Sequence, residues 1–437
     1  MNGCWCFKII TTDSSTGGRE SILELKKDGL KTQAILFLTE SISSGMLSLY
    51  SILAVPFVMA VVGSIILSLV MCIHDFFKTR NYLPKLHFRE STLTGHLLKK
   101  CNLRDRPFAP PFWLRNAHIQ TILAAIMPKT EVNFDREYLQ MRDKGIVALD
   151  WVVSVQPKIK KKSTILLIIP GITADALSVG ALCHCANQKG LKTVVFNRRG
   201  HGGSVLTTPK LQSPGDPADL RQVVKYIKLK YPKAKIAAVA YGTGCGLLIS
   251  YLGEFGSSSL VAVGVCISPC YDVSERFANS MYSIYDYVFL FRLKAILCNH
   301  TKALSSVIDM KIAMQSSSFQ EYDASVYCKL YGYDNMEEYW DRNNPIRDVD
   351  DISVPVLCIN SLDDPFNSES DIPYDLFKYY PNFLLVATER GGHCGFLEGL
   401  PPRSWADKLC LDYIDAVLEF TIKGYTHNSR GAVRSTI

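Results

Sequence analysis

The sequence has little excess charge of either sign and lacks the cysteine spacing of common zinc sites. It holds 48 basic and 41 acidic residues, a net charge of +7 over 437 residues. This small excess is spread along the chain, so we expect no nucleic-acid partner. None of the fourteen cysteines forms a C-x-x-C pair, which excludes the usual zinc ribbon. Cysteines scattered through apolar runs favour a reducing compartment, and we expect neither a metal nor a cofactor.

Charge is also absent from one long stretch near the N-terminus, residues 46–73. About twenty apolar residues cross a bilayer, and a cleavable signal peptide has a shorter apolar region nearer the start of the chain. We therefore expect a retained single-pass transmembrane anchor, with a buried helix as the alternative. Lys78 and Arg80 follow closely, so the positive-inside rule predicts a cytosolic C-terminal domain. We expect the membrane to be the endoplasmic reticulum or a related one.

Short apolar runs after the anchor predict an α/β domain. Helical stretches separate most of them, which is typical of a parallel sheet crossed by helices, and a hairpin precedes them. The expected strands are 137–141, 146–153, 164–169, 193–197, 235–240, 261–267, 355–360 and 383–387. The expected parts of the chain are an N-terminal segment 1–45, the anchor 46–73, a linker 74–106, an eight-stranded, mostly parallel α/β domain 107–425 with a helical cap at about 271–350, and a flexible tail 426–437.

The most informative motif lies where the expected strand 235–240 meets the following helix. Residues 240–244 are Ala-Tyr-Gly-Thr-Gly. A G-x-S-x-G turn at such a junction holds a nucleophilic serine at the top of a parallel sheet. The small residues of that turn are largely present, but Gly242 stands at the serine position and supplies no oxygen. The fallback nucleophiles are Thr243, Cys245 or a hydrolytic water.

Two later loops carry an acid and a histidine in the chain order that acyl-transfer chemistry uses. Asp364 lies in an Asp-Asp-Pro turn after the expected strand 355–360, and His393 lies in the glycine-rich loop 391–399. The carboxylate is expected to hold the imidazole in one tautomer and to stabilise its charged form. Each loop alone is typical of an ordinary turn, but their positions after consecutive strands favour a site.

An oxyanion hole is expected beside the turn at Gly242. Gly171 and Ile172 follow the expected strand 164–169, where a backbone amide is aimed at the developing negative charge. Thr243 is expected to supply a second amide. A plain glycine turn is compatible with the same role.

Six stretches carry a resemblance to a known family. The chain resembles the AB hydrolase 4 family of the AB hydrolase superfamily, a group of single-pass esterases and lipases, from about residue 105 to residue 420. The resemblance implies an α/β-hydrolase fold and carboxylesterase or acylglycerol-lipase chemistry, with Asp364 and His393 as the charge-relay pair. Active members place a serine nine positions before the tyrosine that is Tyr251 here, which is the position of Gly242. The matching stretches are 117–121, 196–200, 213–219, 250–254, 363–365 and 391–399.

These observations leave three functions open. The first is a pseudoenzyme that keeps the fold as a membrane-anchored regulator or scaffold in lipid metabolism, with control of lipolysis as the process and a lipid or a protein as partner. The second is an ester hydrolase or acylglycerol lipase that uses Thr243, Cys245 or a water. The third is an adaptor that uses only its surface. Gly242 favours the first function, and the presence of Asp364 and His393 favours the second.

Overall fold

The computed structural model describes residues 56, 58–70, 73, 83–127, 129–153, 164–272 and 284–434, except for the side chains of 423–434. The chain divides into two compact units, Met1–Thr79 and Arg80–Ile437. In the first unit, residues 58–70 are helical. No helix within the described ranges is both long enough and apolar enough to cross a bilayer. Much of the expected anchor 46–73 lies outside the described residues, so the anchor stays a prediction.

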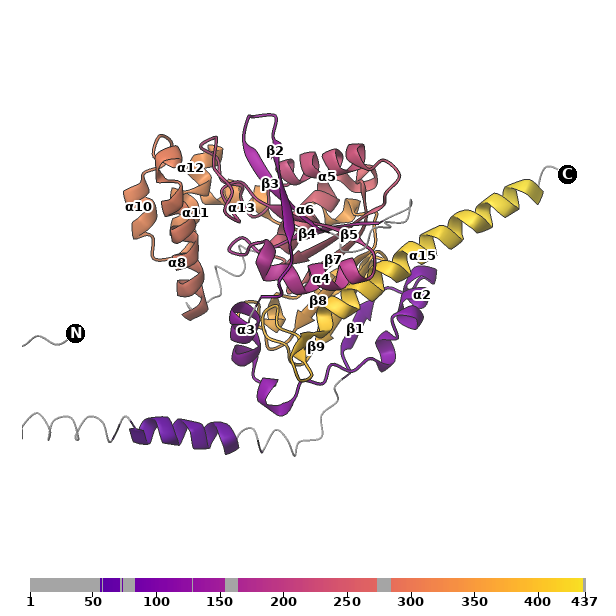
Figure 1. The fold of residues 1–437 in the computed structure, drawn as a ribbon, viewed down its shortest axis with the longest axis horizontal. Coiled ribbons are helices and arrows are strands. Elements are labelled where there is room, and N and C mark those ends of the chain that lie inside the picture. The colour runs from indigo at the N-terminus through magenta and orange to yellow at the C-terminus, as the bar shows by residue number, and fades with distance from the viewer. Residues whose placement is uncertain are drawn as a thin grey trace, which may run out of the picture. The chain divides into compact units, whose positions relative to one another are not determined.

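The second unit is built on a nine-stranded sheet with the order β1-β9-β8-β7-β6-β4-β5-β3-β2 (Figure 1). Strands β4 to β9 pair in parallel with one another, whereas β1, β2 and β3 pair antiparallel with their neighbours. The expected mostly parallel sheet is therefore confirmed. The strands are β1 (Lys85–Phe88), β2 (Phe134–Gln140), β3 (Ile146–Val152), β4 (Ile165–Ile169), β5 (Lys192–Asn197), β6 (Ile236–Tyr241), β7 (Val261–Ile267), β8 (Val356–Ser361) and β9 (Phe383–Thr388).

Helices cover both faces of this sheet. Along β4, Ile165, Leu167 and Ile169 join one apolar core, while Leu166 and Ile168 join the other, as the alternation of side chains in a strand requires. The first core includes residues of α5 (Ala218–Lys230), α6 (Thr243–Phe255) and α14 (Tyr374–Tyr379). The second includes residues of α2 (Thr92–Lys100), α4 (Gly180–Gln188) and α15 (Trp405–Arg434). Outside the cap, the unit also contains helix α3 (Ala117–Ile126) and a short ribbon of β10 (Leu397–Glu398) and β11 (Arg403–Ser404).

The structure differs from the expectation in the number of strands and in two boundaries. The sheet has nine strands rather than eight, because β1 pairs antiparallel with β9 at the edge. This strand and helix α2 lie inside the expected linker 74–106, so the folded unit begins earlier than expected. Four residues are too few to show a strand period, and only the pairing with β9 defines them. Helix α15 continues through residues 426–434, which were expected to be a flexible tail, and no proline interrupts it.

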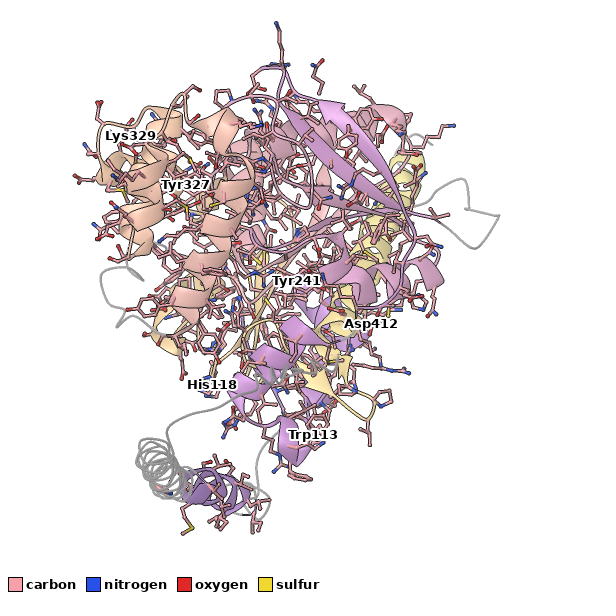
Figure 2. The ribbon with its side chains drawn as sticks, turned by 60° about the vertical axis from the view of Figure 1, so that its left-hand side comes forward. Trp113, His118, Tyr241, Tyr327, Lys329 and Asp412 are labelled. Carbon is pink, nitrogen blue, oxygen red and sulfur yellow. The ribbon has the colours of Figure 1, made fainter. Side chains whose placement is uncertain are left out.

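The expected cap is a cluster of helices between β7 and β8 that gathers on one side of the sheet (Figure 1). Its apolar core contains Leu293 and Leu297 together with Ile172 from the loop after β4. Figure 2 shows Tyr327 and Lys329 in the cap and Tyr241 at the end of strand β6. The cap therefore packs against a loop of the expected site. Its described helices are α8 (Ile284–Asn299), α9 (Thr301–Leu304), α10 (Met310–Gln315), α11 (Phe319–Ser325), α12 (Tyr327–Tyr331) and α13 (Met336–Asn343).

Candidate active site

A sharp turn joins β6 to α6 at Gly242. The φ angle of this glycine is +49° and its ψ angle is −122°, a combination that side-chain-bearing residues adopt only with strain. The Gly242 amide donates a hydrogen bond to the Ile267 carbonyl at 2.9 Å. Two residues on, a Cβ atom at Gly244 would clash with the Ile169 carbonyl oxygen. The backbone therefore has the close approach and the strained turn of a nucleophile elbow.

Asp364 and His393 meet at the carboxyl ends of β8 and β9. His393 Nδ1 lies 2.9 Å from one Asp364 carboxylate oxygen, Oδ2. The other oxygen, Oδ1, accepts the amide protons of Phe366 at 2.8 Å and Asn367 at 3.2 Å. These bonds fix the carboxylate, so it holds the imidazole with Nδ1 toward the acid and Nε2 away from it.

The neighbouring carboxylate has a different task. Asp363 Oδ1 accepts the Gly392 amide proton at 2.9 Å and the Ser361 hydroxyl proton at 2.5 Å. These contacts tie the turn after β8 to the loop that carries His393. The two acids of the Asp-Asp-Pro triplet are thus separated by role: Asp364 orients the imidazole, and Asp363 holds the two loops together.

Gly242 lies beside Nε2, the imidazole nitrogen that faces away from Asp364. A Cβ atom built on Gly242 would lie 3.1 Å from His393 Nε2. A side chain at residue 242 would therefore reach the imidazole, which is the geometry that a nucleophile and its general base require. The structure brings together Gly242, His393 and Asp364, but residue 242 supplies no hydroxyl group.

The charged neighbours of His393 favour the protonated form of its imidazole. Burial lowers the pKa of His393, but the charges of Asp364 and Cys394 and their hydrogen bonds raise it, and the net pKa lies well above the ordinary value of a histidine. The side chain keeps 21% of its surface exposed. A charged imidazole is thus stabilised at a site that solvent reaches.

The hydroxyl group of Thr243 lies within the expected oxyanion hole. Thr243 Oγ1 accepts the amide proton of Ile172 at 2.7 Å. A Cβ atom built on Gly171 would lie 3.7 Å from the same oxygen. Thr243 is also the first residue of α6, where a backbone amide has no carbonyl acceptor within the helix. The two expected amides are near one another, and the Thr243 side chain occupies the position at which Ile172 would meet an oxyanion.

These contacts bear on the two fallback nucleophiles. The Thr243 hydroxyl is directed to Ile172. Cys245 is fully buried, and its Sγ donates to the Ala240 carbonyl at 3.2 Å. Burial raises the pKa of its thiol. A thiol that is buried and protonated is a poor nucleophile, so Cys245 is suited to packing.

The sequence did not predict that Phe366 and Cys394 would lie against the His393 side chain. The Phe366 ring lies 4.5 Å from the His393 ring, and Phe289 of α8 lies 6.3 Å from Phe366. Cys394 follows His393 directly and contributes to its raised pKa. The position of Cys394 next to the histidine was visible in the sequence, whereas the contact of Phe366 depends on the turn at Asp364.

A second aromatic contact joins the cap to the sheet unit. His118 Nδ1 and the Tyr285 hydroxyl lie 2.6 Å apart, and their rings stack at 5.6 Å. The Tyr285 ring also lies 5.1 Å from Phe366. Helix α8 therefore presents aromatic side chains to the neighbourhood of His393, and the site is apolar on the side of the cap.

The elbow, the Asp–His pair and the cap are the parts of one fold family. Residues 164–400 match the family model of the alpha/beta hydrolase fold. The chain belongs to the alpha/beta hydrolase family. Human protein ABHD15 is 38% identical over 325 residues, which cover 71% of this chain and 69% of that protein.

Two other relatives carry names of lipid-cleaving enzymes. Mouse phospholipase ABHD3 is 29% identical over 77% of this chain and 85% of its own length. Zebrafish (Danio rerio) monoacylglycerol lipase ABHD2 is 26% identical over 83% of this chain and 89% of its own length.

Proposed function

We propose that this protein is a regulator or scaffold in lipid metabolism that binds an acyl lipid beneath its cap and does not hydrolyse it through a serine. The observation that carries the proposal is Gly242: a Cβ built on it would lie 3.1 Å from His393 Nε2, but the glycine supplies no oxygen. An Asp–His pair and an oxyanion hole without a nucleophile give only weak catalysis.

The class of ligand follows from the surroundings of the site. Phe289, Phe366 and Tyr285 place apolar surface between the cap and His393, and a largely apolar site with few polar groups suits an acyl chain. Two relatives named phospholipase and monoacylglycerol lipase support the same class. We propose control of lipolysis as the process, with a partner protein that senses the lipid-bound state.

The proposal includes the membrane. The uncharged stretch 46–73 supports a single-pass anchor, with the second unit on the cytosolic side of the endoplasmic reticulum or a related membrane. The described part of this stretch exposes apolar side chains, among them Val61, Ile65 and Leu69. An anchored protein would meet its acyl ligand at the bilayer surface.

Two measurements on the full chain test the proposal. A fluorophosphonate probe should leave its hydroxyl groups unlabelled, while a photoreactive fatty-acid probe should crosslink near Phe289 and Phe366. Strong labelling of Thr243 would establish the alternative, an ester hydrolase with a non-standard nucleophile. Crosslinking spread evenly over the surface would remove the lipid ligand.

A further inference from the structure

The thiol of Cys394 lies beside the position that a side chain at residue 242 would take. The nearest side-chain atoms to a Cβ built on Gly242 belong to His393, with Nε2 at 3.1 Å, and to Cys394, with Sγ at 3.9 Å. Cys394 is half-buried, in contrast to the fully buried Cys245. The sulfur and the imidazole nitrogen therefore both lie within 4 Å of the point at which a side chain at residue 242 would begin.

The loop holds Cys394 in this position by several contacts. Its φ angle is +56°, which is uncommon for a residue other than glycine. Its amide donates to Ser268 Oγ at 2.9 Å, and its Sγ lies 3.8 Å from the Ile267 carbonyl. The Gly242 amide bonds to that same carbonyl at 2.9 Å. One carbonyl group thus places the sulfur beside the elbow.

The sulfur also has the partners that nucleophilic thiols use. His393 exposes Nε2 toward the elbow while Asp364 holds Nδ1 at 2.9 Å. During attack, a thiol passes its proton to a neighbouring base, and the thiolate that results is the reactive form. The charge of Asp364 then stabilises the imidazolium. The arrangement is a Cys–His–Asp set in which the thiol comes from the histidine loop rather than from the elbow.

We propose that Cys394 is the nucleophile of this site and that it accepts an acyl group from an acyl thioester. The acyl class rests on the function proposed above. The Cys394 proton moves to His393 Nε2, and the thiolate attacks the carbonyl carbon of the thioester. A carbon–sulfur bond forms to Cys394, the bond to the leaving sulfur breaks, and His393 returns its proton to the leaving thiolate. The products are an acyl-Cys394 thioester and a free thiol.

The same geometry predicts that the acyl group stays on Cys394. Release would require water to attack the new thioester, and water is a much weaker nucleophile than a thiolate. The site is therefore expected to be acylated once per chain instead of turning over, which agrees with a regulator.

The test uses the full chain with octanoyl-coenzyme A as the acyl donor and iodoacetamide as a probe of the thiol. Intact mass should rise by one octanoyl group, peptide mapping should place it on Cys394, and hydroxylamine should remove it. Cys394→Ser should abolish this product, and Cys298→Ser, which changes an exposed thiol next to Met314, should not. At pH 6.5, iodoacetamide should modify Cys394 at least about tenfold faster than Cys298, and His393→Gln should remove that advantage.

Equal reaction of Cys394 and Cys298 with both reagents in the wild-type chain would overturn the proposal, and this comparison needs no variant to fold. Rapid alkylation of Cys394 without octanoyl transfer would overturn its role as an acyl acceptor. The failure of the proposed function is seen separately, as fluorophosphonate labelling of a hydroxyl group or as absent fatty-acid crosslinking, and neither result depends on Cys394.

Discussion

Thr243 Oγ1 accepts the amide proton of Ile172 at 2.7 Å, directly beside the elbow. Thr243 therefore does two opposed things. Its backbone amide lies where the second hydrogen-bond donor to an oxyanion is needed. Its side-chain hydroxyl group already accepts the proton of the first donor, the Ile172 amide. Catalytic loss at this site is thus expected to have two components, the absent oxygen of residue 242 and the occupied amide of Ile172.

The first prediction separates these components by substitution. Gly242→Ser should fold, with a strain of about 1–3 kcal/mol at the turn, and should gain fluorophosphonate labelling and slow hydrolysis of p-nitrophenyl acetate. Adding Thr243→Ala should free the Ile172 amide. One oxyanion donor contributes about 10²–10³ in kcat, so the double variant should exceed the single one by at least about tenfold.

Two controls bear on this result. Thr243→Ala alone should stay inactive, because it adds no nucleophile, and His393→Gln in the double variant should abolish the gain. A folded double variant that is no faster than Gly242→Ser would mean that the Thr243 side chain does not limit the site. A folded Gly242→Ser variant that stays unlabelled would mean that the His393 geometry is unproductive, because its Nε2 lies too close to the added Cβ at 3.1 Å.

The second prediction concerns the expected anchor. The full chain should stay with membranes after a carbonate wash, because residues 46–73 carry no charge. Replacing Val62 and Ile66 by aspartate in one variant should release it, since a charged group near the centre of a bilayer costs about 2.5–3.5 kcal/mol on insertion scales. The matched control places aspartate at the exposed, non-anchor positions Leu229 and Ile312. Release of the wild-type chain would remove the anchor from the proposal.

Much of the fold was predictable because its signals are local. Strands such as β6 and β8 are short apolar runs, and parallel strands end at one edge, so Asp364 and His393 were expected to approach each other. Strand β1 was not predictable, because its four residues acquire meaning only by pairing with β9.

The residues of the site were predictable from the sequence, but the orientations of their side chains were less so. The sequence shows that residue 242 is glycine, but the direction of the Thr243 side chain depends on where the loop at Ile172 lies. The place of Cys394 likewise depends on its positive φ angle, since an extended backbone would turn the sulfur elsewhere. Such details arise from tertiary contacts between distant loops.

The third prediction is a pH dependence in the cap. Burial raises the pKa of Asp323, on α11, to about 7, whereas an unfolded aspartate has a pKa of about 3.9. Between these values the folded chain holds a proton that the unfolded chain has lost, so stability falls as pH rises from about 4 to about 7 and then levels off. Asp323→Asn removes this loss, so its melting temperature should exceed that of the wild type at pH 8 and match it near pH 4.

The exposed Asp341 of α13 supplies the control. Asp341→Asn removes one negative charge from the same cap and should leave the pH profile of the wild type unchanged. If Asp323→Asn and Asp341→Asn show the same difference from the wild type at both pH values, the effect comes from net charge and not from burial of Asp323.

The fourth prediction has the opposite sign and reports on His393. Its folded pKa lies well above the ordinary value because of Asp364 and Cys394, so the charged imidazole stabilises the folded chain. That contribution is fully present below the unfolded pKa of about 6.5 and is lost as pH rises through the folded pKa. The melting temperature of the wild type should therefore exceed that of His393→Gln most at pH 6, and the difference should shrink in alkaline solution. His184→Gln, at an exposed position on α4, should show no such trend.

A second control removes the charge of the partner. Asp364→Asn keeps an oxygen for the Phe366 and Asn367 amides but removes the charge, so in that background the effect of His393→Gln should lose most of its pH dependence. A difference that stays constant from pH 6 to pH 9 would show that His393 contributes by packing alone, and the charged pair with Asp364 would then have no part in holding the site together.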